Sequence, residues 1–163
     1  MVSDKLSHID DTGNAHMVDV GAKMDTDRIA VARGEVILSN QTLLLIKQGL
    51  MKKGDVLSIA QIAGILGAKK TSELIPLCHP LSLNQVEVNL EVSEQLPGIM
   101  ITASARTFGK TGVEMEALTA VAIAALTVYD MVKAVEKTGR ITNIHLVEKH
   151  GGRSGDFFYK EDV

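Results

Sequence analysis

The sequence predicts an α+β protein of the ferredoxin-like type, in which an antiparallel sheet packs on helices in the order βαββαβ with one extra helix. Segments that alternate apolar and polar residues, as half-buried strands do, supply the strands of this order. Longer apolar segments that begin beside capping residues supply the helices between them. No repeat, low-complexity tract or linker divides the chain, so we expect a single domain over residues 1–163.

The chain is expected to begin with an irregular arm that leads into a strand. Residues 1–27 are polar, with glycines and charges scattered among them, and are expected to form an N-terminal arm. The charged start of this arm lacks the apolar core of a signal peptide. Alternating apolar and polar residues at 28–39 predict a strand, in which Gly34 is a candidate bulge.

Two helices and a stiff loop should follow the first strand. A helix at 40–51 and another at 56–66 each begin beside a residue whose side chain can cap the first turn. The segment 69–83 contains Pro76 and Pro80. Because proline breaks helices, we expect this segment to be an ordered loop or a short helix with a break.

The second half of the chain supplies a hairpin, a long helix and a last strand. Alternation predicts the strands, and a Pro-Gly pair predicts the turn of the hairpin. The expected elements are strands at 86–92 and 99–105, a helix at 115–137 that ends before Gly139, a strand at 144–148, and a C-terminal tail at 156–163.

Composition excludes several classes of function. The formal net charge of −3 argues against a dedicated nucleic-acid binder, and the three Phe, two Tyr and absent Trp offer few stacking platforms for bases. The longest apolar stretch without a charge, 117–129, is shorter than the roughly 20 residues of a membrane span. The single cysteine allows no intramolecular disulfide, which favours a reducing, cytoplasmic compartment.

The last predicted helix is apolar almost all round. Residues 120–126 are all alanine, valine, isoleucine or leucine, so apolar side chains point in every direction from the axis. A sheet covers one side of a helix, and the remaining cover is expected to come from another subunit. The sequence therefore predicts a homo-oligomer.

Asp130 and Lys133 are three residues apart near the end of this helix and therefore lie on one helical face. The plain interpretation is an exposed ion pair worth about 0.3–0.5 kcal/mol. The functional interpretation rests on position, because Asp130 directly follows the apolar run and an acid near a helix C-terminus opposes the helix dipole. A buried or half-buried pair of this kind is suited to acid–base chemistry.

The segment Gly109-Lys110-Thr111 is similar to the end of a phosphate-binding loop. Ser104 stands where that motif needs a glycine, so we reject a Walker-type NTPase. A tight glycine turn is the plain interpretation, although a lysine near a helix start can still meet an anion. A glycine-rich segment at 151–155 is either a backbone nest for phosphate or a simple exit from the last strand.

Three other titratable residues have a structural and a functional interpretation. His79 lies in the loop bounded by prolines, where it is either a structural residue or a positioned functional side chain. The other histidines are scattered, so no zinc site is expected. Glu114 and Glu116 are either first-turn glutamates favoured by the helix dipole or, in an extended segment, neighbours on one face.

Taken together, these segments resemble one family over nearly the whole chain, from about Leu6 to Phe157. The family is cyclic pyranopterin monophosphate synthase (MoaC) of molybdenum cofactor biosynthesis, whose fold agrees with the ferredoxin-like prediction. The motifs that carry the resemblance are long and occur in order: Met17-Val18-Asp19-Val20, Lys53-Gly54-Asp55-Val56, Leu74-Ile75-Pro76-Leu77-Cys78-His79-Pro80, Thr111-Gly112-Val113-Glu114-Met115-Glu116, Tyr129-Asp130-Met131, and Lys149 followed by Gly151-Gly152.

The resemblance implies a lyase. Its substrate would be a 3′,8-cyclised dihydro-GTP made by an upstream radical SAM GTP cyclase, and its products cyclic pyranopterin monophosphate and pyrophosphate. A molybdopterin synthase would act downstream, and the enzyme would be a hexamer built as a trimer of dimers. The resemblance implies no redox cofactor, and it allows Mg²⁺ to assist the departure of pyrophosphate.

The resemblance also implies roles for individual residues. Asp130 and Lys133 match the catalytic acid–base pair of the family. The matching substrate-binding and polar positions of the pocket are Leu77, Cys78, His79, Met115, Glu116, Glu114, Lys53, Lys69, Arg28, Lys23 and Lys149. Lys133 could exchange protons near neutral pH if its pKa were lowered by burial or by cationic neighbours, whereas Asp130 would favour its charged form.

Spacing along the last helix adds a geometric expectation. Glu116 and Asp130 are 14 residues apart in the numbering, which is about 21 Å along a helix. Two groups that far apart are not expected to touch one reacting ring, so we predict composite active sites shared between subunits. The alternatives are a ferredoxin-like nucleotide- or pterin-binding module without turnover, and a nucleotide-binding protein that uses Lys110.

Overall fold

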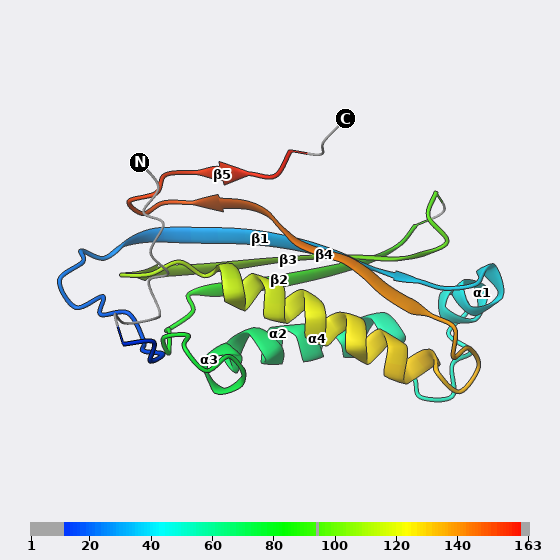
Figure 1. Cartoon of the computed structure of the whole chain (residues 1–163). Coiled ribbons are helices and arrows are strands. Elements are labelled where there is room, and N and C mark those ends of the chain that lie inside the picture. Colours follow the sequence, from blue (N-terminus) through cyan, green and yellow to red (C-terminus); the bar gives the residue numbers. More distant parts are fainter. Residues whose placement is uncertain (1–11, 94, 161–163) are drawn as a thin grey trace.

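The computed structural model describes residues 12–93 and 95–160, and the expectations for residues 1–11 and 161–163 lie outside this range. The elements follow the order strand, helices, two strands, helix and two strands (Figure 1). Their bounds are β1 Thr26–Ile37, α1 Asn40–Lys47, α2 Val56–Lys69, α3 Thr71–Leu74, β2 Gln85–Ser93, β3 Gly98–Gly109, α4 Glu114–Val132, β4 Arg140–His150 and β5 Phe157–Phe158.

The strands form one five-stranded sheet in the order β2-β3-β1-β4-β5. All neighbouring strands are antiparallel, and β1 pairs with β3 along its whole length, from Thr26 opposite Gly109 to Ile37 opposite Gly98. The first four strands in this order have the ferredoxin-like topology, which confirms the predicted fold class. The short β5 extends the sheet at the β4 edge, where only a C-terminal tail was expected.

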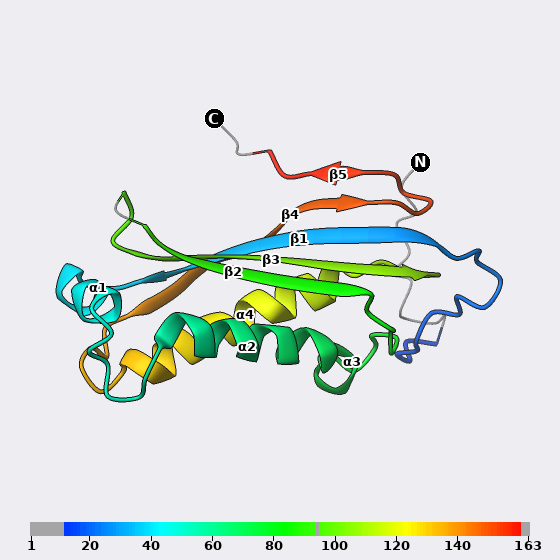
Figure 2. The ribbon, with the colours of Figure 1, turned by 180° about the vertical axis from the view of Figure 1, so that it is seen from behind.

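Helices α2 and α4 lie side by side on one face of the sheet (Figures 1 and 2). Alternate residues of the central strand, Ala30, Ala32 and Val36, point to the helices and are fully buried. The two alanines let the helices approach the sheet closely, and the core lies between the two layers.

Gly34 is needed for this close approach rather than for a bulge in its own strand. A Cβ at this position would lie 2.6 Å from Val121 Cγ1 of α4 and 3.0 Å from Ile144 Cγ1 of β4. The irregular pairing lies between β1 and β4: Val31 pairs with Glu148 and Ala32 with Leu146, so the extra residue is on β4. A second shift lies between Arg33, which pairs with His145, and Glu35, which pairs with Thr142. The pairing is therefore irregular at Gly34 as predicted, although the extra residue is again on β4.

Three predicted helix ends are also corrected. Helix α2 continues to Lys69 instead of ending at residue 66. Helix α1 ends at Lys47 instead of residue 51, because the chain turns at Gly49, whose φ of 67° suits glycine. Helix α4 ends at Val132 instead of residue 137. The physical reason is Glu136, whose carboxylate accepts hydrogen bonds from Ser39 N at 3.0 Å and Ser39 Oγ at 2.9 Å and so draws the chain away from the helix axis.

The cover of α4 differs in part from the prediction. Helix α2 packs along one side of it, so the sheet is not its only cover within the chain. Apolar side chains still face outward from the helical layer, with Ile62 58%, Leu66 52% and Leu126 55% exposed. Helix α4 is long and apolar enough to cross a membrane by length and composition, but 56% of its most apolar window is buried, as in the core helix of a globular protein.

Candidate functional site

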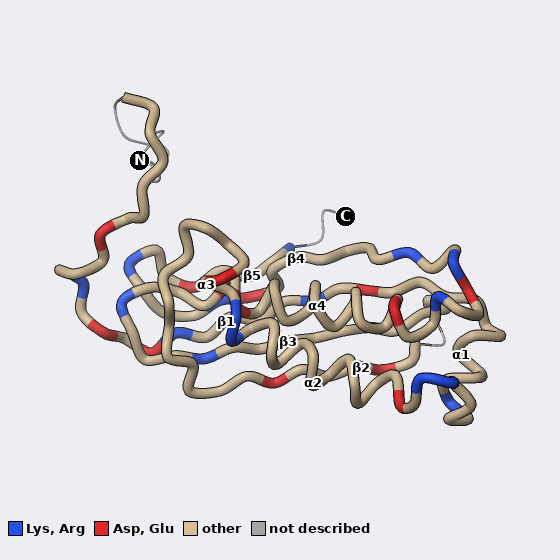
Figure 3. Tube along the Cα trace, turned by 90° about the horizontal axis from the view of Figure 1, so that it is seen from below, with Lys and Arg blue, Asp and Glu red and all other residues tan. Residues whose placement is uncertain are grey.

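Charged residues gather toward the two ends of the elongated molecule, as the trace in Figure 3 shows. One end holds the start of α4, the loop after α3, the ends of β3 and β4, and the irregular residues before β1. The other end holds the C-terminal end of α4 and the loop that precedes α2. The candidate residues divide between these two ends.

A cavity of about 360 Å³, which we call the Cys78 cavity, opens at the N-terminal end of α4. Residues 16–25 fold back along this end of the sheet and supply one wall, and the loop after α3 supplies another. The lining residues are Val18, Val20, Lys23, Leu77, Cys78, His79, Leu81, Thr111, Gly112, Glu114, Met115 and Glu116.

His79 is fixed in this wall by the N-terminal arm. Its Nε2 lies 2.7 Å from the carbonyl oxygen of Val18. A carbonyl oxygen can only accept a hydrogen bond, so Nε2 carries a proton and is the donor in this contact. The backbone contact of the preceding residue, Cys78 N to Ile75 O at 3.1 Å, turns the loop toward the cavity.

Glu116 is the buried acid of the Cys78 cavity, with only 4% of its surface exposed. Burial raises the pKa of Glu116 above the ordinary glutamate value and is the largest influence on it. A hydrogen bond from its own backbone N–H lowers the pKa, and the charge of the neighbouring Glu114 raises it. Burial also raises the pKa of the Cys78 thiol, and the negative charge that Glu116 carries when it is ionised adds to this rise. Cys78 is therefore a neutral thiol rather than a thiolate nucleophile.

A second cavity of about 330 Å³, the Arg28 cavity, adjoins the first. Lys23, Thr111, Gly112 and Glu114 line both cavities, so the two form one continuous depression. Five cationic residues line the Arg28 cavity, namely Lys23, Arg28, Lys110, Lys149 and Arg153, and the Nζ of Lys110 donates to the carbonyl oxygen of Gly21 at 2.6 Å. Such a concentration of positive charge suits a ligand with several phosphates.

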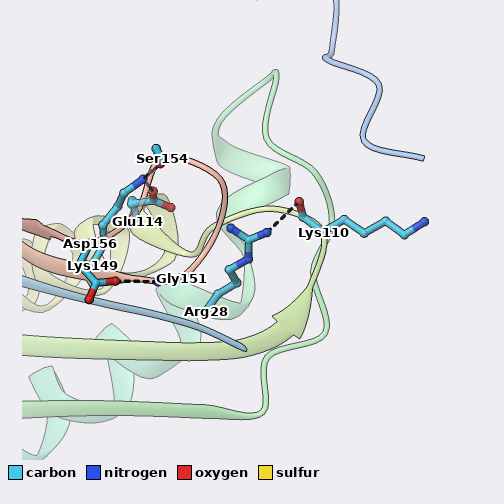
Figure 4. Close-up of polar contacts among 7 residues, drawn as sticks. All are labelled: Arg28, Lys110, Glu114, Lys149, Gly151, Ser154 and Asp156. Carbon is cyan, nitrogen blue, oxygen red and sulfur yellow. Dashed lines mark hydrogen bonds and ion pairs between the residues drawn. The ribbon is translucent and has the colours of Figure 1, made fainter. Parts of the chain in front are cut away.

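Arg28 is held between the end of β3 and the glycine-rich loop after β4 (Figure 4). Its Nε donates to the carbonyl oxygen of Gly109 at 3.3 Å, and its Nη2 lies 3.5 Å from the carbonyl oxygen of Lys110. Gly151 and Gly152 both have φ of 87°, and a Cβ on Gly152 would collide with the Arg28 guanidinium. The loop can therefore lie against Arg28 only with glycine at this position.

Lys149 connects this loop with the start of α4. Its Nζ forms an ion pair with Glu114 Oε1 at 3.0 Å and donates to Ser154 Oγ at 3.1 Å (Figure 4). Gly151 N donates to Asp156 Oδ1 at 3.1 Å, which closes the loop. The glycine-rich segment is thus an ordered wall of a cationic cavity, which favours its interpretation as part of an anion site.

The other end of α4 carries a separate cluster. Asp130 lies between two lysines, with its carboxylate 2.7 Å from Lys133 Nζ and 2.6 Å from Lys53 Nζ. Hydrogen bonds from both lysines lower the pKa of Asp130 from its ordinary 3.8 to about 2. The same hydrogen bond raises the pKa of Lys133.

Known proteins match this chain over a range that includes both groups of candidate residues. The model of the MoaC family matches residues 17–152. The chain is 57% identical over 152 residues to proteins named cyclic pyranopterin monophosphate synthase from Cereibacter sphaeroides and Dinoroseobacter shibae, covering 93% of this chain and 96% of each relative. This chain belongs to the MoaC family.

Within this MoaC-family chain, the predicted site residues form two groups and one outlier. Leu77, Cys78, His79, Met115, Glu116, Glu114, Lys23, Arg28 and Lys149 line the two joined cavities. Asp130, Lys133 and Lys53 form the cluster at the far end of α4. Lys69, the last residue of α2, is exposed and lines neither cavity.

Asp130 and Lys133 are half exposed within one chain, at 53% and 52%, and Asp130 raises the pKa of Lys133. The lowered pKa that proton exchange by Lys133 near neutral pH requires is therefore not present within one subunit. One expectation about the glutamates is corrected. Glu114 and Glu116 do not need an extended segment to reach one site. Both lie in the first turn of α4, where the Cys78 cavity wraps around the end of the helix.

Several lining residues escaped the prediction of site residues. Val18 takes part through its backbone carbonyl, which any residue could supply, so no sequence signal marks it. Lys110 and Arg153 line the Arg28 cavity, and each stood in a glycine-rich segment with an anion-binding interpretation. Pairing of β1 with both β3 and β4 is what brings these two segments together.

Proposed function

We propose that this MoaC-family chain is a cyclic pyranopterin monophosphate synthase. It would convert (8S)-3′,8-cyclo-7,8-dihydroguanosine 5′-triphosphate to cyclic pyranopterin monophosphate and pyrophosphate. The observation that supports this most directly is the pair of joined cavities, one with acidic, thiol and imidazole groups and one with five cationic residues. A nucleotide that reacts at its ring and loses pyrophosphate needs both kinds of environment.

We assign the purine-derived ring to the Cys78 cavity and the triphosphate to the Arg28 cavity. Hydrogen-bonding groups of the first cavity, His79 and Glu116 among them, suit ring nitrogens and exocyclic groups. Arg28, Lys149 and Arg153 of the second would meet the negative charge that accumulates as pyrophosphate departs. Lys23 lines both cavities and would lie near the junction of ring and phosphates.

We further propose that the active site is composite. Glu116 and Asp130 belong to the same helix and are 14 residues apart in the numbering, so about 21 Å separates them along the axis. One ring cannot contact both within a single chain. In the proposed assembly, Asp130, Lys133 and Lys53 of one subunit complete the cavities of its neighbour, and the subunits form a hexamer as a trimer of dimers.

The proton chemistry of the second cluster follows from its charges. Asp130 is ionised throughout the physiological pH range and fixes the position of both lysines. Lys133 carries a proton in the free chain and would therefore act first as an acid. Desolvation by the neighbouring subunit and the nearby Lys53 would make that proton easier to release.

The proposal also covers the cofactor and metal requirements of the enzyme and its place in the pathway. The chain needs no redox cofactor, because the reaction consists of proton transfers and the departure of pyrophosphate. A Mg²⁺ ion that took part would arrive with the phosphates, since residues 12–93 and 95–160 hold no cluster of three His, Cys, Asp or Glu suited to a metal. We propose a cytoplasmic enzyme that acts between a radical SAM GTP cyclase and a molybdopterin synthase.

The deciding experiment incubates the purified protein with the cyclised dihydro-GTP and follows pyrophosphate release together with formation of the pterin chromophore. Stoichiometric release of pyrophosphate at multiple turnovers is the expected result. Tight binding of the substrate without release would instead identify a nucleotide- or pterin-binding module without turnover. A parallel reaction with EDTA shows whether Mg²⁺ contributes to the rate.

A further inference from the structure

Glu114 and Glu116 sit in the same cavity, but they have opposite surroundings. Glu114 forms an ion pair with Lys149, and its side chain is 29% exposed. Glu116 is almost completely buried, and within the described part of the chain no lysine, arginine or histidine forms an ion pair with it. Two carboxyl groups placed in such different environments commonly take different protonation states and different roles.

We propose that Glu116 is a neutral carboxylic acid in the free enzyme and serves as the proton donor when the purine-derived ring opens. This inference rests on the proposed function, because it names the acid for one step of that reaction. It gives Glu116 one proton transfer of that reaction and leaves the others to the Asp130–Lys133 pair that the neighbouring subunit would contribute.

The groups that face Glu116 all favour, or at least permit, the neutral form. Glu114, in the same helical turn, disfavours a second negative charge nearby. Cys78, from the loop after α3, is a neutral thiol and offers no positive charge. Lys23 of the arm lines the cavity without an ion pair to Glu116, and His79 has its Nε2 proton committed to the Val18 carbonyl.

The energetic reason is desolvation. A carboxylate that is removed from water and is not paired with a cation is costly, whereas the protonated acid is not. The same burial is what raises the pKa of Glu116, with Glu114 adding to the rise. A substrate ring that fills the cavity would exclude more water and strengthen this preference.

In the proposed step, the proton of Glu116 passes to N9 of the substrate as the C8–N9 bond breaks. In the substrate, C8 is a saturated carbon bonded to the two ring nitrogens N7 and N9. The lone pair of N7 forms a second bond to C8, the C8–N9 bond breaks, and its electron pair passes to N9, which takes the proton of Glu116. The products are a C8=N7 iminium, an N9–H amine and the Glu116 carboxylate, which regains a proton from solvent after the product leaves.

The protonation state is tested first on the intact oligomer without substrate. Protein labelled with ¹³C at the glutamate side-chain carboxyls is titrated by NMR, and the signal that Glu116→Gln removes is assigned to Glu116. Glu91→Gln, on the exposed face of β2, identifies a reference signal in the same way. We expect the Glu116 signal to keep the position of the protonated acid at the pH of the activity assay; a signal already at the position of the ionised form at that pH overturns the proposal.

The role is tested by kinetics. Glu116→Gln keeps the size and hydrogen bonding of the side chain but has no acidic proton, so kcat should fall about 100-fold or more with KM changed only a few-fold. Glu116→Asp should retain more activity than Glu116→Gln, and its alkaline loss of kcat should begin at a lower pH. Turnover of Glu116→Gln within a few-fold of wild type would refute the acid role.

The proposed function and the acid role of Glu116 can be tested separately. If wild-type protein released no pyrophosphate, the proposed function would fail, yet the NMR titration would still decide whether Glu116 is neutral. If pyrophosphate is released and Glu116 titrates like an exposed glutamate, only the inference about Glu116 fails. Circular dichroism and light scattering on each variant show whether a loss of activity reflects misfolding.

Discussion

Lys53 holds the end of α4 by two hydrogen bonds to one residue, Asp130. Its Nζ donates to the Asp130 carboxylate at 2.6 Å and to the Asp130 carbonyl oxygen at 2.8 Å. The carbonyl is near the C-terminal end of the helix, where a positive charge is favourable. One lysine from the loop before α2 therefore both orients the acid and caps the helix that carries it.

Replacing Lys133 by alanine should remove turnover without disturbing the assembly. Lys133 follows the last residue of α4 and is half exposed, so its loss leaves the core intact while it deletes the proposed acid. We expect kcat to fall by about 100-fold or more, with an unchanged oligomer by light scattering. Lys137→Ala, at an exposed position of the same loop, is the control; wild-type turnover in Lys133→Ala would remove Lys133 from the mechanism.

The charge of Asp130 should make a contribution to stability that disappears in acid. Its pKa is about 2 in the folded protein and 3.8 when unperturbed, so the folded state binds this proton less readily than the unfolded state. The contribution is therefore present above pH 3.8 and is lost as the pH falls toward 2. We expect the Tm difference between wild type and Asp130→Asn to be constant near neutral pH and to shrink over that window.

Thermal unfolding followed by circular dichroism at a series of pH values measures this difference. Asp19→Asn, which alters a carboxylate of the arm far from Asp130, serves as the control variant. A Tm difference that stayed constant down to pH 2 would show that the two lysines do not stabilise the ionised form of Asp130.

Composite sites make a prediction about mixtures of inactive variants. Lys133→Ala lacks one lysine of the cluster at the end of α4, and His79→Ala lacks one side chain of the wall of the Cys78 cavity. In a hybrid oligomer, some sites combine the intact Lys133 of one variant with the intact His79 of the other. We expect partial recovery of pyrophosphate release after the two variants exchange subunits, and none before exchange. Exchange verified by mass spectrometry with no recovery would contradict the composite site.

Gly152 should be more important for substrate binding than another glycine of the same loop. Gly152→Ala places a methyl group against the Arg28 guanidinium and strains a backbone with φ of 87°. Gly155→Ala carries similar backbone strain, with φ of 70°, but its Cβ would meet open space. We expect KM to rise about tenfold more in Gly152→Ala than in Gly155→Ala, since one weakened charged contact costs about 1.4 kcal/mol.

Equal KM values for the two alanine variants would mean that contact with Arg28 is not what the glycine provides. Steady-state kinetics with the cyclised substrate gives the KM values, and direct titration with inorganic pyrophosphate gives an independent measure of the anion site. Both variants are checked for an unchanged oligomer before the comparison.

Local patterns were sufficient to predict the main helices and the first four strands, because their causes are local; β5, which forms only by pairing with β4, was not predicted. The alternation in β1 reflects burial on one face, and Asp55 accepts hydrogen bonds from Leu57 N and Ser58 N at the start of α2 as a capping residue should. The end of α4 was mispredicted because it depends on Glu136 and Ser39, which are far apart in the sequence. Helical propensity depends on local sequence alone and therefore does not predict that contact.

The candidate site was predictable to the extent that it consists of titratable side chains in recognisable motifs. His79 and Glu116 could be singled out in this way, but the cavity that they share could not, because its third wall is backbone of the arm. The surroundings of Asp130 were also out of reach. Its second partner, Lys53, comes from a loop 77 residues earlier in the chain.

The walls of the two cavities come from opposite ends of the described chain. Val18 and Lys23 leave the ribosome early, whereas Lys149 and Arg153 leave it late, and the central strand β1 must wait for β3 and then β4 before both its edges are paired. A nascent chain that stops short of Lys149 thus has the arm and Arg28 but no enclosed place for phosphates. On the proposed assignment of the phosphates to the Arg28 cavity, affinity for a polyphosphate would appear only after Lys149 and Arg153 have been added, so it would report that this part of the chain has folded against the arm.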